Sequence, residues 1–284
     1  MKNVLVTGCS SGIGRATAEL LRNAGWTVFP TARKTADLDA LKKAGFTAIE
    51  LDINSSESID RAIKHLLQET DGTLQALVNN AGFGMPGAIE DLTRDAMRAQ
   101  FETNLFGLQE LTNKLIPTLR KNKSGRIVNV SSVVGRLSLP FMGIYSASKF
   151  ALEGLSDALR IELSQDHIRV SLIEPGPIQT QFSTNCATQG EEQLPIEKSR
   201  FKTAYKNYFK QRRNGGTSND RFRLPPEAVA KKILHAIESP RPKIRYCVTV
   251  PAYLGDWAAR FVPRTLLDHL MIRMVKKRFA STQK

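Results

Sequence analysis

The chain has 284 residues, of which 41% are hydrophobic and 24% charged, a composition typical of a folded globular protein. Its 3 cysteines and 4 histidines are too few and too scattered for a disulfide framework or a metal site, and no stretch reaches the about 18 consecutive apolar residues of a membrane-spanning helix. The net charge of +14 resides in two late segments, because residues 198–223 carry nine Lys/Arg against one acid and residues 241–284 carry ten against two. The start of the chain shows no secretory signal pattern, so we expect a cytoplasmic protein.

Short β-rich runs alternate with helical patterns over the first two thirds of the chain. We predict strands at 3–7, 27–31, 48–51, 74–79, 126–131, 168–173 and 246–250, and helices at 12–24, 55–69, 95–121 and 145–163. Gly25 is expected to end the first of these helices, Asn54 or Ser55 to cap the second, and Pro117 to interrupt the third.

This alternation is typical of a parallel sheet covered by helices on both faces. The predicted fold class is therefore α/β, a doubly wound Rossmann sheet of about seven strands. We expect a single domain over residues 1–284, with an irregular insertion near 179–224 that covers the site as a lid, and a C-terminal basic amphipathic tail near 253–284.

A glycine-rich turn, Gly8-Cys9-Ser10-Ser11-Gly12-Ile13-Gly14, joins the first strand to the first helix. Glycines let the backbone approach a pyrophosphate closely, and the helix N-terminus supplies free N–H groups and the positive end of a dipole. The spacing G-x-x-x-G-x-G differs from the G-x-G-x-x-G dinucleotide fingerprint.

Further motifs follow this turn in a fixed order. Asn79-Asn80-Ala81-Gly82 closes the fourth strand, Ser132 precedes Tyr145 by thirteen residues, Lys149 follows it by four, and Pro175-Gly176 ends the sixth strand. Over roughly residues 4–182, this series resembles the short-chain dehydrogenase/reductase family. The runs at 8–14, 145–154 and 171–177 are especially similar to the branch of 17β-hydroxysteroid and retinol dehydrogenases and to bacterial NADP-dependent aldehyde reductases.

Tyr145 and Lys149 lie on one face of a predicted helix, so the lysine ammonium is expected to lower the pKa of the phenol. Tyr145 then serves as general acid or base, and Ser132 at the end of the fifth strand holds the substrate oxygen. The resemblance implies that Asn104 completes the catalytic set, at a helix irregularity where it holds a water linked to Lys149. It also implies that Lys149 binds the nicotinamide ribose.

The resemblance implies a larger set of cofactor contacts. They are Gly8, Ser10, Ser11, Gly12, Ile13, Gly14, Arg33, Asp52, Ile53, Asn80, Ala81, Gly82, Tyr145, Lys149, Pro175, Gly176, Ile178 and Thr180. Within this set, Arg33 follows the second strand at the point where NAD-binding folds carry an acid for the ribose 2′-OH. Because a guanidinium pairs well with a phosphate, NADP(H) is favoured over NAD(H).

The residues expected around the substrate are mostly apolar: Phe83, Met85, Pro86, Leu137, Leu139, Phe141, Met142, Ile178 and Phe182. This composition favours a small lipophilic aldehyde, ketone or alcohol. Arg136 is the one candidate for holding a substrate carboxylate. The alternatives are a steroid or retinol dehydrogenase that uses NAD(H), and a catalytically idle scaffold that only binds the cofactor.

The two basic segments do not by themselves identify the partner that they bind. We expect no nucleic acid, because no recognition module accompanies the charge. In the tail, Leu267, Leu270, Met271, Met274 and Val275 fall on one side of a predicted helix, and Arg273, Lys276 and Lys277 fall elsewhere. Such a helix fits peripheral contact with a membrane, packing on its own domain, or packing on a second subunit of the homo-oligomer that the resemblance implies.

Overall fold

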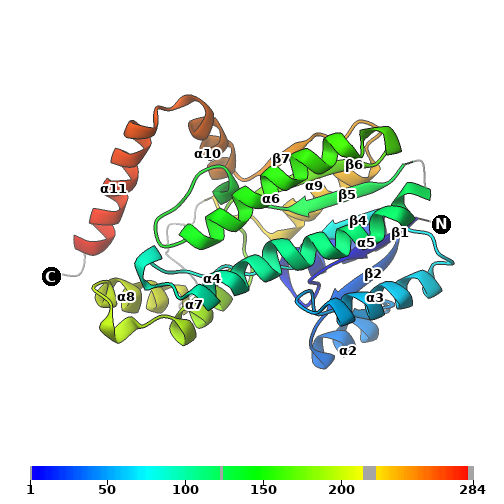
Figure 1. The fold of residues 1–284 in the computed structure, drawn as a ribbon, viewed down its shortest axis with the longest axis horizontal. Helices are drawn as coiled ribbons and strands as arrows, with labels where there is room; N and C mark the ends of the chain where they lie inside the picture. The colour runs from blue at the N-terminus through cyan, green and yellow to red at the C-terminus, as the bar shows by residue number, and fades with distance from the viewer. Residues whose placement is uncertain (1, 122–123, 214–221, 281–284) are drawn as a thin grey trace.

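The computed structural model describes residues 2–121, 124–213 and 222–280. Seven parallel strands form one sheet in the order β3-β2-β1-β4-β5-β6-β7 (Figure 1). Their bounds are β1 (Asn3–Val6), β2 (Thr27–Ala32), β3 (Ile49–Glu50), β4 (Ala76–Asn79), β5 (Arg126–Val130), β6 (Arg169–Pro175) and β7 (Arg245–Val248). This arrangement confirms the predicted doubly wound fold class.

Helices cover both faces of the sheet. One layer consists of α1 (Gly12–Asn23), α2 (Thr35–Lys43) and α9 (Pro226–Glu238), and the other of α3 (Ser56–Glu69), α5 (Gly107–Lys121) and α6 (Gly143–Glu162). The alternation of side chains along a strand supplies both cores: Val4 and Val6 pack in the first layer, and Leu5 packs in the second. The second layer lies in front of the sheet in Figure 1.

The predicted helices exist, with differences that have identifiable causes. Ser55 caps α3 by accepting a hydrogen bond from the Ser58 N–H, and Gly25 follows the cap of α1 with a φ of +83°. Pro117 does not interrupt α5, which continues to Lys121, so that expectation was wrong. The predicted long helix over 95–121 is instead divided into α4 (Arg94–Phe101), a π-helical turn (Glu102–Phe106) and α5.

The insertion near 179–224 was expected to be irregular, and that expectation was wrong. It contains α7 (Phe182–Gln193) and α8 (Lys202–Arg213), and residues 214–221 of the predicted lid lie outside the described part of the chain. Phe201, Tyr205, Tyr208 and Phe209 pack this segment into a third hydrophobic cluster, beside the loop that follows β4.

The C-terminal region forms two helices, α10 (Val250–Phe261) and α11 (Arg264–Ala280), of which α11 extends away from the sheet (Figure 1). The one-sided apolar face predicted for the tail is not found on α11. Leu267 is buried there, while Leu266, Leu270 and Ile272 are all exposed. The side chains of Met274 and Lys277, and residues 281–284, lie outside the described part of the structure.

One backbone contact fixes how α5 meets the loop after β3. A Cβ atom at Gly107, the first residue of α5, would lie 1.9 Å from the Ile53 carbonyl oxygen. Only a glycine lets the helix approach that loop so closely. Gly154 in α6 offers the matched case, because a Cβ atom there would meet nothing within 4 Å.

We expect Gly107→Ala to destabilise the protein by at least about 2 kcal/mol, because neither backbone segment can yield to the added methyl group. Gly154→Ala should stabilise it by about 0.5–1 kcal/mol through helix propensity. Urea unfolding of both variants measures the difference. A Gly107→Ala variant as stable as the parent would contradict the packing described.

Candidate active site

The carboxyl ends of six parallel strands bring the predicted site residues to one edge of the sheet. The glycine turn follows β1, Arg33 follows β2, Asp52 follows β3, Asn80 to Gly82 follow β4, Ser132 follows β5, and Gly176 follows β6. The strand order reverses between β1 and β4, and in open α/β sheets such a reversal opens a crevice for ligands.

The glycine turn is held in place by side chains of the β4 end. The Asn80 side-chain amide donates to the carbonyl oxygens of Thr7 and Gly8, at 2.9 and 3.0 Å. The Thr7 hydroxyl accepts hydrogen bonds from the backbone N–H groups of Asn80 and Ala81, both at 2.9 Å. A Cβ atom at Gly14 would lie 2.2 Å from the Gly8 carbonyl oxygen, so the turn admits no side chain there.

The first helix offers its N-terminus at this turn. Its cap residue Ser11 makes no side-chain capping hydrogen bond, so it leaves the N–H groups of the first turn to another acceptor. Thr180, from the segment after β6, lies against Gly12 on the other side. A turn with glycines at its closest backbone approaches and a helix N-terminus together fit the phosphates of a dinucleotide.

Ser132, Tyr145 and Lys149 line one cavity of about 820 Å³. Tyr145 and Lys149 lie one turn apart in α6, and the Lys149 Nζ lies 5.9 Å from the centroid of the phenol ring. The Lys149 ammonium donates to the Val130 carbonyl oxygen at 2.8 Å. The Ser132 hydroxyl lies 3.3 Å from the Pro175 carbonyl oxygen.

Burial dominates the ionisation of both α6 residues. It raises the pKa of Tyr145, against a hydrogen bond with Ser132 that lowers it. The sequence-based expectation that Lys149 sets the pKa of the phenol below its usual value is therefore wrong for the protein alone. Burial lowers the pKa of Lys149 to about 8, while the Glu153 carboxylate, one turn further along α6, raises it.

Asn104 lies in the π-helical turn and is fully buried. Its side chain accepts from the Phe83 N–H at 3.1 Å and donates to the Phe83 carbonyl oxygen at 2.9 Å. It also donates to the Ser148 hydroxyl in α6 at 3.2 Å. Asn104 therefore ties the loop after β4 to the helix that carries Tyr145 and Lys149.

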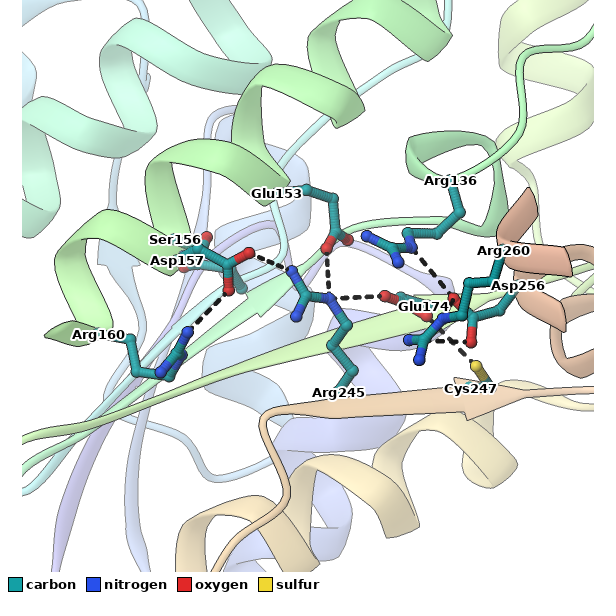
Figure 2. Close-up of polar contacts among 11 residues, drawn as sticks. Arg136, Glu153, Ser156, Asp157, Arg160, Glu174, Arg245, Cys247, Asp256 and Arg260 are labelled. Atoms are coloured by element: carbon teal, nitrogen blue, oxygen red, sulfur yellow. Dashed lines mark hydrogen bonds and ion pairs between the residues drawn. The ribbon is translucent and has the colours of Figure 1, made fainter.

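A buried ionic network extends from Glu153 to the edge of the sheet (Figure 2). Arg245 in β7 donates from Nε to Glu153 at 2.9 Å and from Nη2 to Asp157 at 2.6 Å, and its Nε lies 3.3 Å from Glu174 in β6. The Cys247 thiol donates to the other Glu174 oxygen at 3.2 Å. Burial, together with the nearby Glu153 charge, raises the pKa of Glu174 to about 7.

This network could not be predicted from the sequence, because its members are separated by up to 92 residues. Its position matters, since Tyr145, Lys149, Glu153 and Asp157 follow one another at four-residue intervals along one face of α6. A continuous row of polar groups thus leads from the cavity to Arg245.

Arg33 and Asp52 lie at the far end of the same sheet edge. The Arg33 side chain is 62% exposed, and its Nη1 lies 3.9 Å from an Asp52 carboxylate oxygen. The Arg33 guanidinium is thus accessible to a ligand, because its contact with Asp52 is long and lies at a partly exposed site. Ile53, the next residue, is buried and packs in the core.

The predicted apolar lining is largely present. Phe83, Pro86, Leu139, Phe141, Met142, Ile178 and Phe182 line the cavity. Met85 packs instead in the hydrophobic cluster below it, and Leu137 is not among the lining residues. Arg136 donates to Asp256 at 3.1 Å, away from the cavity lining, so its expected role toward a substrate carboxylate is wrong.

Helices α7 and α8 supply lining residues that the sequence analysis missed: Ser183, Cys186, Ala204, Tyr205, Asn207, Tyr208 and Lys210. The aromatic spacing at 201, 205, 208 and 209 was the available signal, because it is the stripe of an amphipathic helix. In the described part of the chain, no group of three metal-ligating side chains gathers and no helix could cross a membrane.

Comparison with known proteins agrees with this geometry. A family model described as short chain dehydrogenase matches residues 2–191. An uncharacterised oxidoreductase of Escherichia coli, YbbO, is 42% identical over 270 residues, which cover 95% of this chain and 94% of that protein. An NADPH-dependent 3-dehydrocapnine reductase of Ornithobacterium rhinotracheale is 33% identical, with 98% of each chain covered.

Retinol dehydrogenase 8 of Bos taurus is 34% identical over 86% of this chain and 80% of its own length. Among solved structures, a short-chain dehydrogenase from Streptomyces avermitilis superposes with a TM-score of 0.75 at 33% identity, covering 99% of this chain and 97% of that one. These similarities confirm the resemblance that the motifs indicated.

Proposed function

Since the chain belongs to the short-chain dehydrogenase family of oxidoreductases, we propose that it interconverts a lipophilic aldehyde or ketone and its alcohol, with NADP(H) as the cofactor and Tyr145 as the proton donor and acceptor. The observation that carries this proposal is the shared cavity. Ser132, Tyr145 and Lys149 present a hydroxyl, a phenol and an ammonium to a space that is otherwise lined mainly by apolar and aromatic side chains.

The ionisation of Tyr145 supports its role in reduction. Because burial raises its pKa, the phenol keeps its proton at neutral pH and can donate it to a carbonyl oxygen. The Ser132 hydroxyl lies beside it and can hold the same oxygen. The Lys149 charge, one turn away, stabilises the phenolate that forms when the proton leaves.

The residues at the glycine turn fit a nicotinamide dinucleotide, which when bound supplies the hydride. The glycine turn and the N-terminus of α1 would hold its pyrophosphate. Asn80, Gly82, Gly176, Ile178 and Thr180 line the cavity between that turn and Tyr145, and would enclose the nicotinamide end. Lys149 would also bind the nicotinamide ribose.

Arg33 supports NADP(H) over NAD(H). It is exposed and follows the end of β2, the point at which dinucleotide folds carry the residue that binds the adenosine ribose. Its planar guanidinium can pair with a 2′-phosphate through two hydrogen bonds. The NADPH dependence of the 3-dehydrocapnine reductase relative agrees with this assignment.

The cavity supports a lipophilic substrate. Phe141, Met142, Phe182 and Tyr208 surround it with apolar and aromatic area, and its volume of about 820 Å³ would be shared between the nicotinamide end of the cofactor and the substrate. A panel of medium- and long-chain aldehydes, ketosteroids and retinal, assayed by NADPH oxidation, identifies the class. An idle scaffold would oxidise NADPH with none of these substrates, so the same assay distinguishes the two functions.

Tyr145→Phe should lower the turnover number for the best aldehyde of that panel by at least about 100-fold, because the variant lacks the proton donor. NADPH binding, followed by its fluorescence, should survive. Tyr208→Phe is the matched control, since Tyr208 is a second phenol on the same cavity. Turnover of Tyr145→Phe within a few-fold of the Tyr208→Phe value would refute the assignment.

Arg33→Asp should raise the KM for NADPH at least about tenfold, because it replaces attraction of the 2′-phosphate by repulsion. The KM for NADH should change little. Lys43→Asp, the same charge change on an exposed side chain at the other end of α2, is the control. Parallel changes in both KM values for Arg33→Asp would show that Arg33 does not select the cofactor.

A further inference from the structure

Exposed apolar side chains concentrate at the C-terminal end of the described chain. Fifteen large hydrophobic residues are exposed in the described chain, and eight of them lie between Val250 and Ile272, on α10 and α11. Scattered exposed apolar residues need no explanation, but a concentration of them on two successive helices marks a surface that something covers.

Helix α10 presents this apolar area on one face. Val250, Leu254, Trp257 and Phe261 recur at intervals of four, three and four residues, and are 52%, 61%, 56% and 69% exposed. The opposite face holds the helix to the body of the protein through small residues. Ala252 is 1% exposed, and Gly255 packs closely against Val133 beside Ser132.

The helix that follows, α11, is strongly positive. Helix α11 contains five Lys/Arg residues and one acid, and Arg264, Arg273 and Lys276 are exposed on it. Leu266, Leu270 and Ile272 are exposed among them. A second copy of the chain, packed symmetrically on this surface, would bring cations against cations.

An anionic bilayer complements both the apolar face of α10 and the positive charge of α11. Tryptophan and phenylalanine favour the boundary between headgroups and acyl chains, and exposed cations gain free energy beside anionic headgroups. In the described chain no helix could span a membrane, so the contact is one of surface helices.

We propose that α10 and α11 dock this protein on an anionic lipid surface, with Leu254, Trp257 and Phe261 inserted at the headgroup boundary and the α11 cations on lipid phosphates. Through its opposite face, α10 packs against Val133 in the wall of the cavity. The docking does not depend on the proposed reaction. If the reaction is correct, docking holds the enzyme at the surface of the bilayer in which a lipophilic substrate dissolves.

Co-sedimentation of the full chain tests this proposal, with vesicles of equimolar phosphatidylglycerol and phosphatidylcholine and with vesicles of phosphatidylcholine alone. The protein should bind the anionic vesicles, and salt should weaken the binding. Leu254→Ser/Phe261→Ser should lower the partition coefficient by more than about tenfold, because two large side chains no longer leave water. Ile161→Ser, which removes a 64% exposed side chain from α6, should leave it unchanged.

Trp257 gives a second readout. The chain has 2 tryptophans, and Trp26 is 7% exposed, so a blue shift of the emission on adding anionic vesicles reports Trp257. Arg264→Glu/Arg273→Glu leaves the apolar face of α10 intact and should also weaken binding to the anionic vesicles.

Absence of binding, equal binding to both kinds of vesicle, or equal binding of the Leu254→Ser/Phe261→Ser and Ile161→Ser variants would overturn the proposal. A dimer in sedimentation velocity that Leu254→Ser/Phe261→Ser dissociates, without vesicle binding, would overturn it in favour of an interface between copies. Unchanged reduction of a short water-soluble aldehyde by that variant shows that the fold and the reaction are intact, so the two proposals can fail separately.

Discussion

The proposed chemistry depends on one ammonium group, that of Lys149, which must stay charged inside the wall of the cavity. Lys149 is 5% exposed, and taking its charge out of water favours the neutral amine, so its pKa falls to about 8. The Glu153 carboxylate limits that fall by supplying an opposite charge, and the Val130 carbonyl accepts a hydrogen bond from the ammonium. Glu153 in turn forms an ion pair with Arg245, which also pairs with Asp157 and Glu174. The chemistry proposed for Tyr145 thus rests on a network that begins at the outer strand β7.

The parts of the site that the sequence predicted are local ones. The glycine turn, the interval between Tyr145 and Lys149, and the residues directly after each strand are readable because strand and helix periods place them without long-range information. The seven strands were found for the same reason. Even Asn104, which the family resemblance suggested would lie at a helix irregularity, is in a π-helical turn.

The parts that the sequence did not predict arise from contacts between distant segments. Arg245 meets Glu153 across 92 residues, and no local pattern indicates that pairing. The segment over 179–224 was expected to be irregular. The sequence of α7 has only a weak hydrophobic pattern, and the aromatic stripe of α8, which packs over the cavity, was not recognised as helical. The apolar face was assigned to α11 rather than α10, since only the packing of Ala252 and Gly255 shows which side of α10 remains outside.

The pH dependence of kcat/KM for carbonyl reduction, compared between the parent protein and Glu153→Gln, tests the central electrostatic claim most directly. That ratio reports ionisations of the free enzyme, so the parent should lose activity as Lys149 deprotonates above about pH 8. Glu153→Gln removes the charge that raises the pKa of Lys149, so its alkaline limb should move to lower pH by about one unit. Glu162→Gln, at the exposed end of α6, should leave the limb in place. An alkaline limb that stays at the parent position in Glu153→Gln would contradict the account.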